Sequence, residues 1–155
     1  MMGDNLSASL SLKLGLLLFW ALWYLFALTT NLCEGFEQLR IFPRTWSFAS
    51  RNFRAIAQAT SRYSVSRRLP GFLFFGVLCW QVAAVVLFTS AIAVSALAGA
   101  LDSQAVNAAF IAGLSLWSAF MLADEFLQQY EVEHAHVLFF MAQLLTLIAL
   151  HQLPA

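Results

Sequence analysis

Glutamate and histidine residues are concentrated in segment 124–136, between the last two apolar runs of the chain. Glu131 and His134 are three residues apart, as are Glu133 and His136, and this spacing puts a carboxylate and an imidazole on one face of a helix. In four-helix carboxylate proteins such a pair supplies two ligands to one metal ion. We therefore consider a transition-metal site here. The candidate ligands are Glu125, Glu131, His134 and His136.

A purely structural interpretation of this acidic hinge is also open. The two Glu–His pairs point about 200° apart on one helix, because each residue turns by ~100°, so they cannot line the same site. Further ligands would have to come from Asp124, or from Glu34 and Glu37 in the first loop. Alternatively, the acidic residues are solvated and favour the positive N-terminal end of the last span.

Other kinds of catalytic or cofactor chemistry find less support. His136 and His151 lie at opposite ends of the last apolar run, roughly 22 Å apart on a helix, so an axial haem pair would need two subunits. No serine or cysteine is spaced to act with a histidine as a nucleophile, and the sequence has no glycine-rich phosphate loop. We therefore favour a non-enzymatic protein with no nucleic-acid partner.

The composition indicates an integral membrane protein. Of the 155 residues, 61% are hydrophobic and only 10% are charged, against about 25% charged in soluble domains. The uncharged runs reach the roughly 20 residues that a helix needs to cross ~30 Å of hydrocarbon. We predict an all-α, four-helix transmembrane bundle in a single domain. Its spans are about 12–30, 71–97, 105–122 and 136–150.

The first loop, from Cys33 to Leu69, contains most of the basic residues. After Pro43, aromatic and aliphatic residues recur at helical spacing, which predicts an amphipathic helix within 44–63, starting at Ser47 or Ser50. Such a helix lies in the membrane interface, where its arginines reach anionic lipid headgroups. Alternatively, the arginines bind an anionic ligand or a partner protein. The arginines concerned are Arg51, Arg54, Arg62, Arg67 and Arg68.

Seven arginines in one loop favour a cytoplasmic location for that loop. Four spans then put both termini outside and the acidic hinge on the arginine side, where the two charged segments would meet.

Polar side chains within the spans are few. Asn31 ends the first apolar run, and no span has an ionisable residue between its ends. We expect the polar side chains to form hydrogen bonds between helices rather than a path for a solute or proton. They are Gln81, Ser115, Ser118, Gln143 and Thr146.

Several scattered positions resemble a bacterial family known as predicted small integral membrane proteins, a domain of unknown function. They are Asn31, the run 52–56 (Asn-Phe-Arg-Ala-Ile), Trp80-Gln81, the run 113–117, Glu125-Phe126 and Phe139. Phe53 stands where the family has tryptophan, and Gln81 where it has glutamate. The family's linker before the fourth span is also longer and rich in tryptophan and glutamine. The resemblance implies four spans and the bacterial inner membrane, but no activity.

We conclude that the leading hypothesis is an accessory or structural subunit of a larger membrane complex or of a homo-oligomer. A membrane metalloprotein using the hinge and a small-solute transporter are the alternatives.

Overall fold

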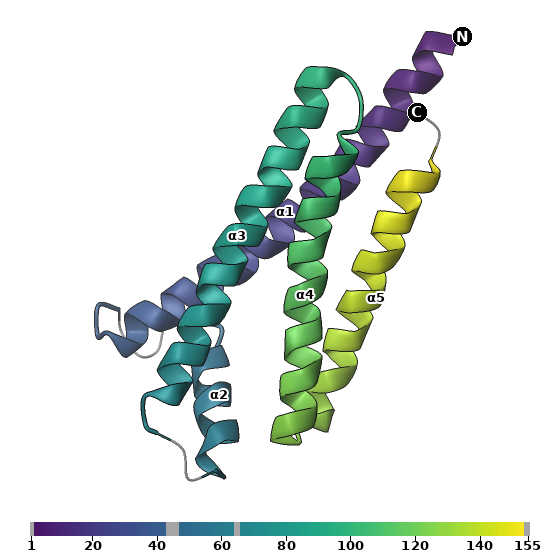
Figure 1. Ribbon diagram of the computed structural model, residues 1–155. Coiled ribbons are helices and arrows are strands. Elements are labelled where there is room, and N and C mark those ends of the chain that lie inside the picture. The colour runs from purple at the N-terminus through teal and green to yellow at the C-terminus, as the bar shows by residue number, and fades with distance from the viewer. Residues whose placement is uncertain (1, 43–46, 64–65, 154–155) are drawn as a thin grey trace. The chain divides into compact units, whose positions relative to one another are not determined.

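The computed structural model describes residues 2–42, 47–63 and 66–153, with side chains described from residue 8 onward. This part of the chain is helical and contains no strand. Five helices follow one another in Figure 1: α1 (Met2–Gln38), α2 (Asn52–Ser61), α3 (Leu69–Ala98), α4 (Ser103–Leu127) and α5 (Tyr130–Gln152). The predicted all-α fold is confirmed.

Four of these helices are long and apolar enough to cross a membrane, namely α1 from Ala8 onward, α3, α4 and α5. The protein is therefore a multi-pass membrane protein. Each helix extends beyond the predicted span, because a helix continues wherever its polar side chains find partners or water. The largest difference is in α1, which runs through Asn31 to Gln38. Glu34 and Glu37 thus belong to this helix and not to the first loop.

The chain divides into two compact units. The first contains Met1–Leu22 and Ala83–Ala155, and the second contains Trp23–Val82. Helices α1 and α3 contribute one half to each unit, and each unit is described below by itself.

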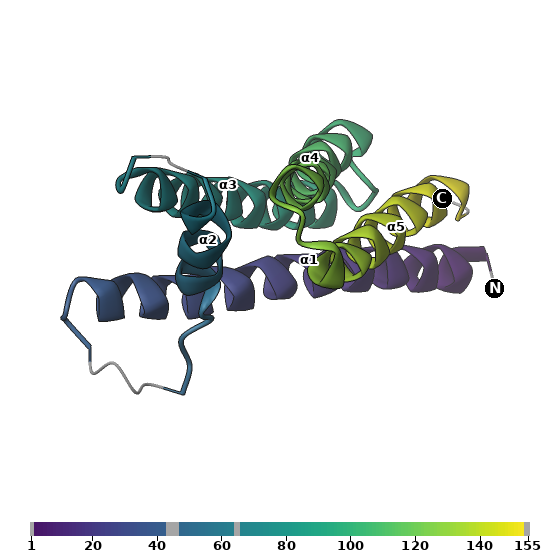
Figure 2. The same cartoon turned by 90° about the horizontal axis from the view of Figure 1, so that it is seen from below.

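In the first unit, α4 and α5 form an antiparallel pair joined by a tight turn (Figures 1 and 2). Gln128 ends α4 in the left-handed conformation, with φ 55°, which reverses the chain within two residues. Aromatic rings fill the interior, where Phe88 of α3 meets Phe110 of α4 edge to face at 5.1 Å between ring centroids. At the other end of α4, Asp102 caps the helix by accepting a hydrogen bond from the Ala105 N–H at 2.7 Å.

In the second unit, α2 lies against the second half of α1 and the first half of α3 (Figures 1 and 2). Phe53 at its start contacts Phe74 of α3, with 5.5 Å between ring centroids. Ala59 and Thr60 are buried on the same helix, whereas Arg54 is exposed. The predicted amphipathic helix is therefore present, but it covers ten residues instead of most of 44–63. Pro43 and the first predicted residues, 44–46, lie outside the described residues.

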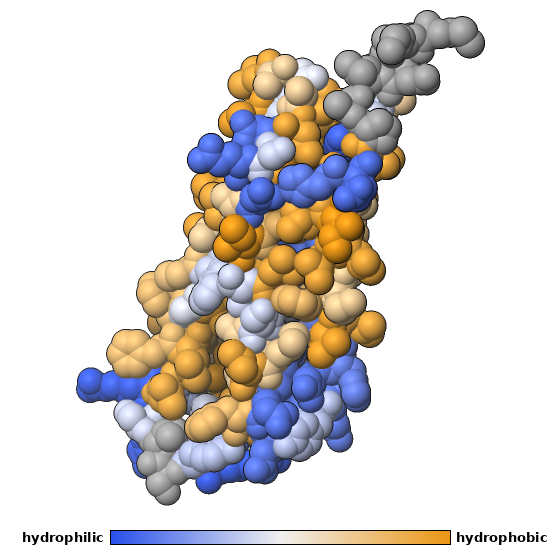
Figure 3. All heavy atoms as spheres, turned by 45° about the vertical axis from the view of Figure 1, so that its right-hand side comes forward, coloured by the Kyte–Doolittle hydropathy of each residue, from blue (hydrophilic) through white to orange (hydrophobic). Residues whose placement is uncertain are grey.

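Much of the surface is apolar. On the face shown in Figure 3, hydrophobic side chains cover most of the area between two groups of hydrophilic side chains. Large apolar side chains with more than half of their area exposed occur on every long helix, including Phe19, Phe72, Ile111 and Leu138. Helices that face lipid have such a surface, because hydrocarbon and not water surrounds them.

Candidate functional site

The second unit contains a buried polar cluster built around Glu34 of α1. This side chain has 0% of its area exposed. One carboxylate oxygen accepts hydrogen bonds from the Ser50 hydroxyl and the Phe53 N–H, both at 2.8 Å. The other accepts from the Arg54 N–H at 3.2 Å. A buried carboxylate is costly unless it is hydrogen-bonded, and three donors meet that requirement here.

These contacts make Glu34 the N-terminal cap of α2. The residue that precedes the helix, Arg51, has a left-handed backbone (φ 67°) and makes no capping hydrogen bond. A cap normally satisfies the second or third N–H of a helix, and those are the groups of Phe53 and Arg54. The negative charge of Glu34 also faces the positive end of the helix dipole. Helix α2 is thus capped by a residue of α1.

A chain of side-chain amides joins the three helices of this unit. The Asn52 amide of α2 donates to Asn31 Oδ1 at 2.8 Å, and the Asn31 amide donates to Gln81 Oε1 of α3 at 2.9 Å. Asn31 and Gln81 are only 1% and 5% exposed. Gln81 therefore hydrogen-bonds between helices, as predicted.

The basic residues of the first loop differ in their surroundings. Arg54 forms an ion pair with Glu37 of α1, with 3.1 Å between Nη2 and Oε2, and the Glu37 side chain is 2% exposed. Arg51, Arg62, Arg67 and Arg68 are exposed. Arg54 thus has its ion-pair partner within the second unit. Binding of lipid headgroups or of a partner protein by the other four arginines stays a prediction.

At the hinge of the first unit, His136 pairs with an acid that the sequence interpretation gave a minor role. Its Nδ1 forms a hydrogen bond with Asp124, which is 7% exposed. Around the imidazole lie Phe120, at 5.0 Å between ring centroids, and Trp117, which stacks on Phe139 at 5.0 Å. An aspartate bound to Nδ1 fixes the orientation of the imidazole. In this arrangement the pair ties the start of α5 to the end of α4.

The other predicted metal ligands are not gathered around His136. Glu125, Glu131 and His134 are exposed. Among the described residues, no group of three or more histidine, cysteine, aspartate or glutamate side chains is placed to hold a metal ion. A hinge metal site, and any cofactor, therefore stay predictions without support from the side-chain arrangement.

Of the other predicted polar residues, Gln143 of α5 is fully buried. Thr146, on the same helix, donates its hydroxyl to the Ala142 carbonyl at 2.7 Å, within its own helix. These two side chains do not test the alternative of a solute path.

Sequence reasoning missed Asn31, Glu34 and Glu37 as interior groups. The sequence did contain a pattern that indicates burial. Positions 31, 34 and 37 follow Tyr24 and Leu28 at helical spacing, and all five residues are buried in the structure. The predicted end of the apolar run at Asn31 obscured it, because carboxylates were expected only outside the membrane.

Comparisons of the chain with protein-family models, curated proteins and solved structures give no match. The resemblance to the predicted small integral membrane proteins therefore stays a prediction.

Proposed function

We propose that the protein is a non-enzymatic accessory or structural subunit of a larger membrane complex or of a homo-oligomer, in the bacterial inner membrane. The observation that carries this proposal is the exposed face of α5. Large apolar residues recur there at intervals of three and four, the spacing of a helix-packing seam. They are Leu138, Met141, Leu145 and Ile148, with 69%, 44%, 58% and 48% of their area exposed.

Small residues accompany this seam. Ala135 and Ala142 are exposed and lie seven residues apart, so they fall on the same side of α5 as Leu138 and Leu145. In a membrane, small residues allow two helix backbones to approach closely, and this close packing drives association where hydrophobicity cannot. Lipid would cover a uniformly bulky face equally well. A row of alanines beside a row of leucines favours a second helix as the partner of α5.

The interior polar groups support a structural role for the remaining helices. The Glu34 carboxylate, the Arg54–Glu37 pair and the Asn31–Gln81 amides all have their partners within the second unit. Their hydrogen-bonding capacity is used to hold α1, α2 and α3 together. We further propose that the arginine-rich loop is cytoplasmic and both termini are outside.

The experiment is native mass spectrometry of protein extracted from its own membranes in mild detergent, with a matched pair of variants. Ala142→Phe places a bulky apolar group on the exposed face of α5, and Ala93→Phe places the same group on an exposed position of α3. We expect wild type and A93F to carry a foreign subunit or a second copy, and A142F to lose it. Wild-type protein that carries lipid alone, or equal assembly of both variants, contradicts the proposal.

A further inference from the structure

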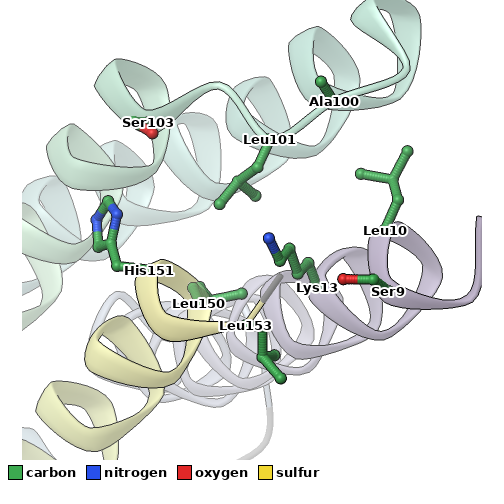
Figure 4. Close-up of a pocket in the computed structure, with 9 residues that line it drawn as sticks. All are labelled: Ser9, Leu10, Lys13, Ala100, Leu101, Ser103, Leu150, His151 and Leu153. Carbon is green, nitrogen blue, oxygen red and sulfur yellow. The ribbon is translucent and has the colours of Figure 1, made fainter. Parts of the chain in front are cut away.

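A cavity of about 320 Å³ lies within the first unit, where the start of α1, the turn between α3 and α4, and the end of α5 meet (Figure 4). Lys13, Ser9, Ser103 and His151 are among the residues that line it. None of these residues belongs to the hinge or to the polar cluster around Glu34, so this cavity is a separate feature of the molecule.

Lys13 is the only lysine of the chain, and its side chain points into the cavity (Figure 4). The residue is 6% exposed. Among the side chains that the structure describes, its ammonium has neither a hydrogen-bond partner nor an ion-pair partner. Its hydrocarbon stem is therefore covered, while the ammonium faces the cavity and not another described side chain. An anion that enters the cavity can form charge-assisted hydrogen bonds with it.

Five of the nine lining residues are apolar, and the polar ones besides Lys13 are Ser9, Ser103 and His151. Ser103 is the first residue of α4, so the cavity lies at the positive end of a 25-residue helix. The neighbouring acid, Asp102, is not among the residues that line the cavity, and its Oδ1 accepts a hydrogen bond from the Ala105 N–H. His151 is held by Asn107, with 2.8 Å between Nε2 and Oδ1.

We propose that this cavity binds a phosphate group, held between the Lys13 ammonium and the start of α4. The first apolar run of the chain starts at about residue 12, so Lys13 stands at the interface of the membrane, where the phosphate of an anionic lipid headgroup can reach the ammonium. Free phosphate carries the same chemistry, and the experiment separates these two sources.

The experiment uses the full-length protein, stripped of lipid in an uncharged detergent. Native mass spectrometry follows binding of short-chain phosphatidylglycerol, with phosphatidylcholine as the zwitterionic control. Thermal unfolding is measured in sodium phosphate and in sodium chloride of equal ionic strength. We expect Lys13→Gln to weaken phosphatidylglycerol binding at least tenfold, and Lys13→Arg to retain most of it. Arg40→Gln, which removes an exposed arginine of the second unit that is not among the predicted headgroup contacts, should bind as wild type does.

Stabilisation by sodium phosphate that disappears in K13Q identifies free phosphate as a ligand. Lys13-dependent binding of phosphatidylglycerol alone identifies the headgroup. Ser103→Asp provides a test that does not remove the lysine, because aspartate is favourable in the first turn of a helix and leaves α4 intact. S103D should abolish both the binding of phosphatidylglycerol and the stabilisation by sodium phosphate, because its carboxylate repels the anion. Equal binding by wild type, K13Q and S103D overturns the proposal.

Discussion

At the scale of single residues, Glu34 of α1 is notable because it caps another helix, α2. Its carboxylate replaces the capping side chain that Arg51 does not provide, and it does so from another helix. Because the side chain is fully buried, water cannot take over these hydrogen bonds when the carboxylate is removed.

We predict that Glu34→Gln lowers the free energy of unfolding by about 2–4 kcal/mol, since it removes the charge and turns one acceptor into a donor. Thermal unfolding in detergent measures the loss. Trypsin cleavage at Arg51 and Arg54 should also become faster, because α2 loses its cap. Glu125→Gln, at an exposed glutamate, is the control and should change neither quantity. Unchanged cleavage in E34Q would show that α2 does not depend on this carboxylate.

The residues of the candidate site were only partly predictable from the sequence. Gln81 was recognised because a lone amide deep in an apolar run needs a partner. Glu34 was not, because its partners at Ser50, Phe53 and Arg54 follow 16 to 20 residues later in the chain. Local spacing indicates which face a residue occupies, but not which distant segment supplies its hydrogen bonds.

At the scale of helices, the amide chain from Asn52 through Asn31 to Gln81 connects α2, α1 and α3. Removing one buried amide leaves the other without its partner, whereas removing both leaves an apolar contact. The effects of the two substitutions should therefore not add up.

We predict that Asn31→Leu and Gln81→Leu each destabilise the protein by about 1–3 kcal/mol. The double variant should be less destabilised than the sum of the two by about 1 kcal/mol. Unfolding of the four proteins in one detergent provides the comparison. Strict additivity would show that the two amides do not stabilise each other.

Helix type and number were predictable, and helix ends were not. Long uncharged runs predict four spans because hydrocarbon thickness sets a minimum length. The ends were placed at the first polar residue, yet α1 continues through Asn31 to Gln38 and α4 through Asp124 to Leu127. Both polar residues are buried with partners, so they lie on packed faces and do not terminate a helix.

At the scale of the whole molecule, four spans require both termini to lie on one side of the membrane and the first loop on the other. The proposed cytoplasmic location of this loop follows from its excess of arginine, because positively charged loops tend to be retained in the cytoplasm.

We predict that a membrane-impermeant maleimide labels Gln152→Cys but not Arg67→Cys in intact cells, and labels both after lysis. Both positions are exposed, so accessibility depends on the side of the membrane. The background carries Cys33→Ala and Cys79→Ala, which remove the native thiols. Labelling of R67C alone in intact cells would reverse the orientation.

The cap that α1 provides for α2 also has a consequence for biosynthesis. Glu34 leaves the ribosome before α2 does, so the acceptor for the first turn of α2 is already in place when that helix is made. Gln81 follows about thirty residues after Asn52, and the amide chain closes only once α3 has been synthesised. We therefore expect helix α2 to start forming on the first span alone and to be secured by the second, so that the order of membrane insertion is part of how the loop folds.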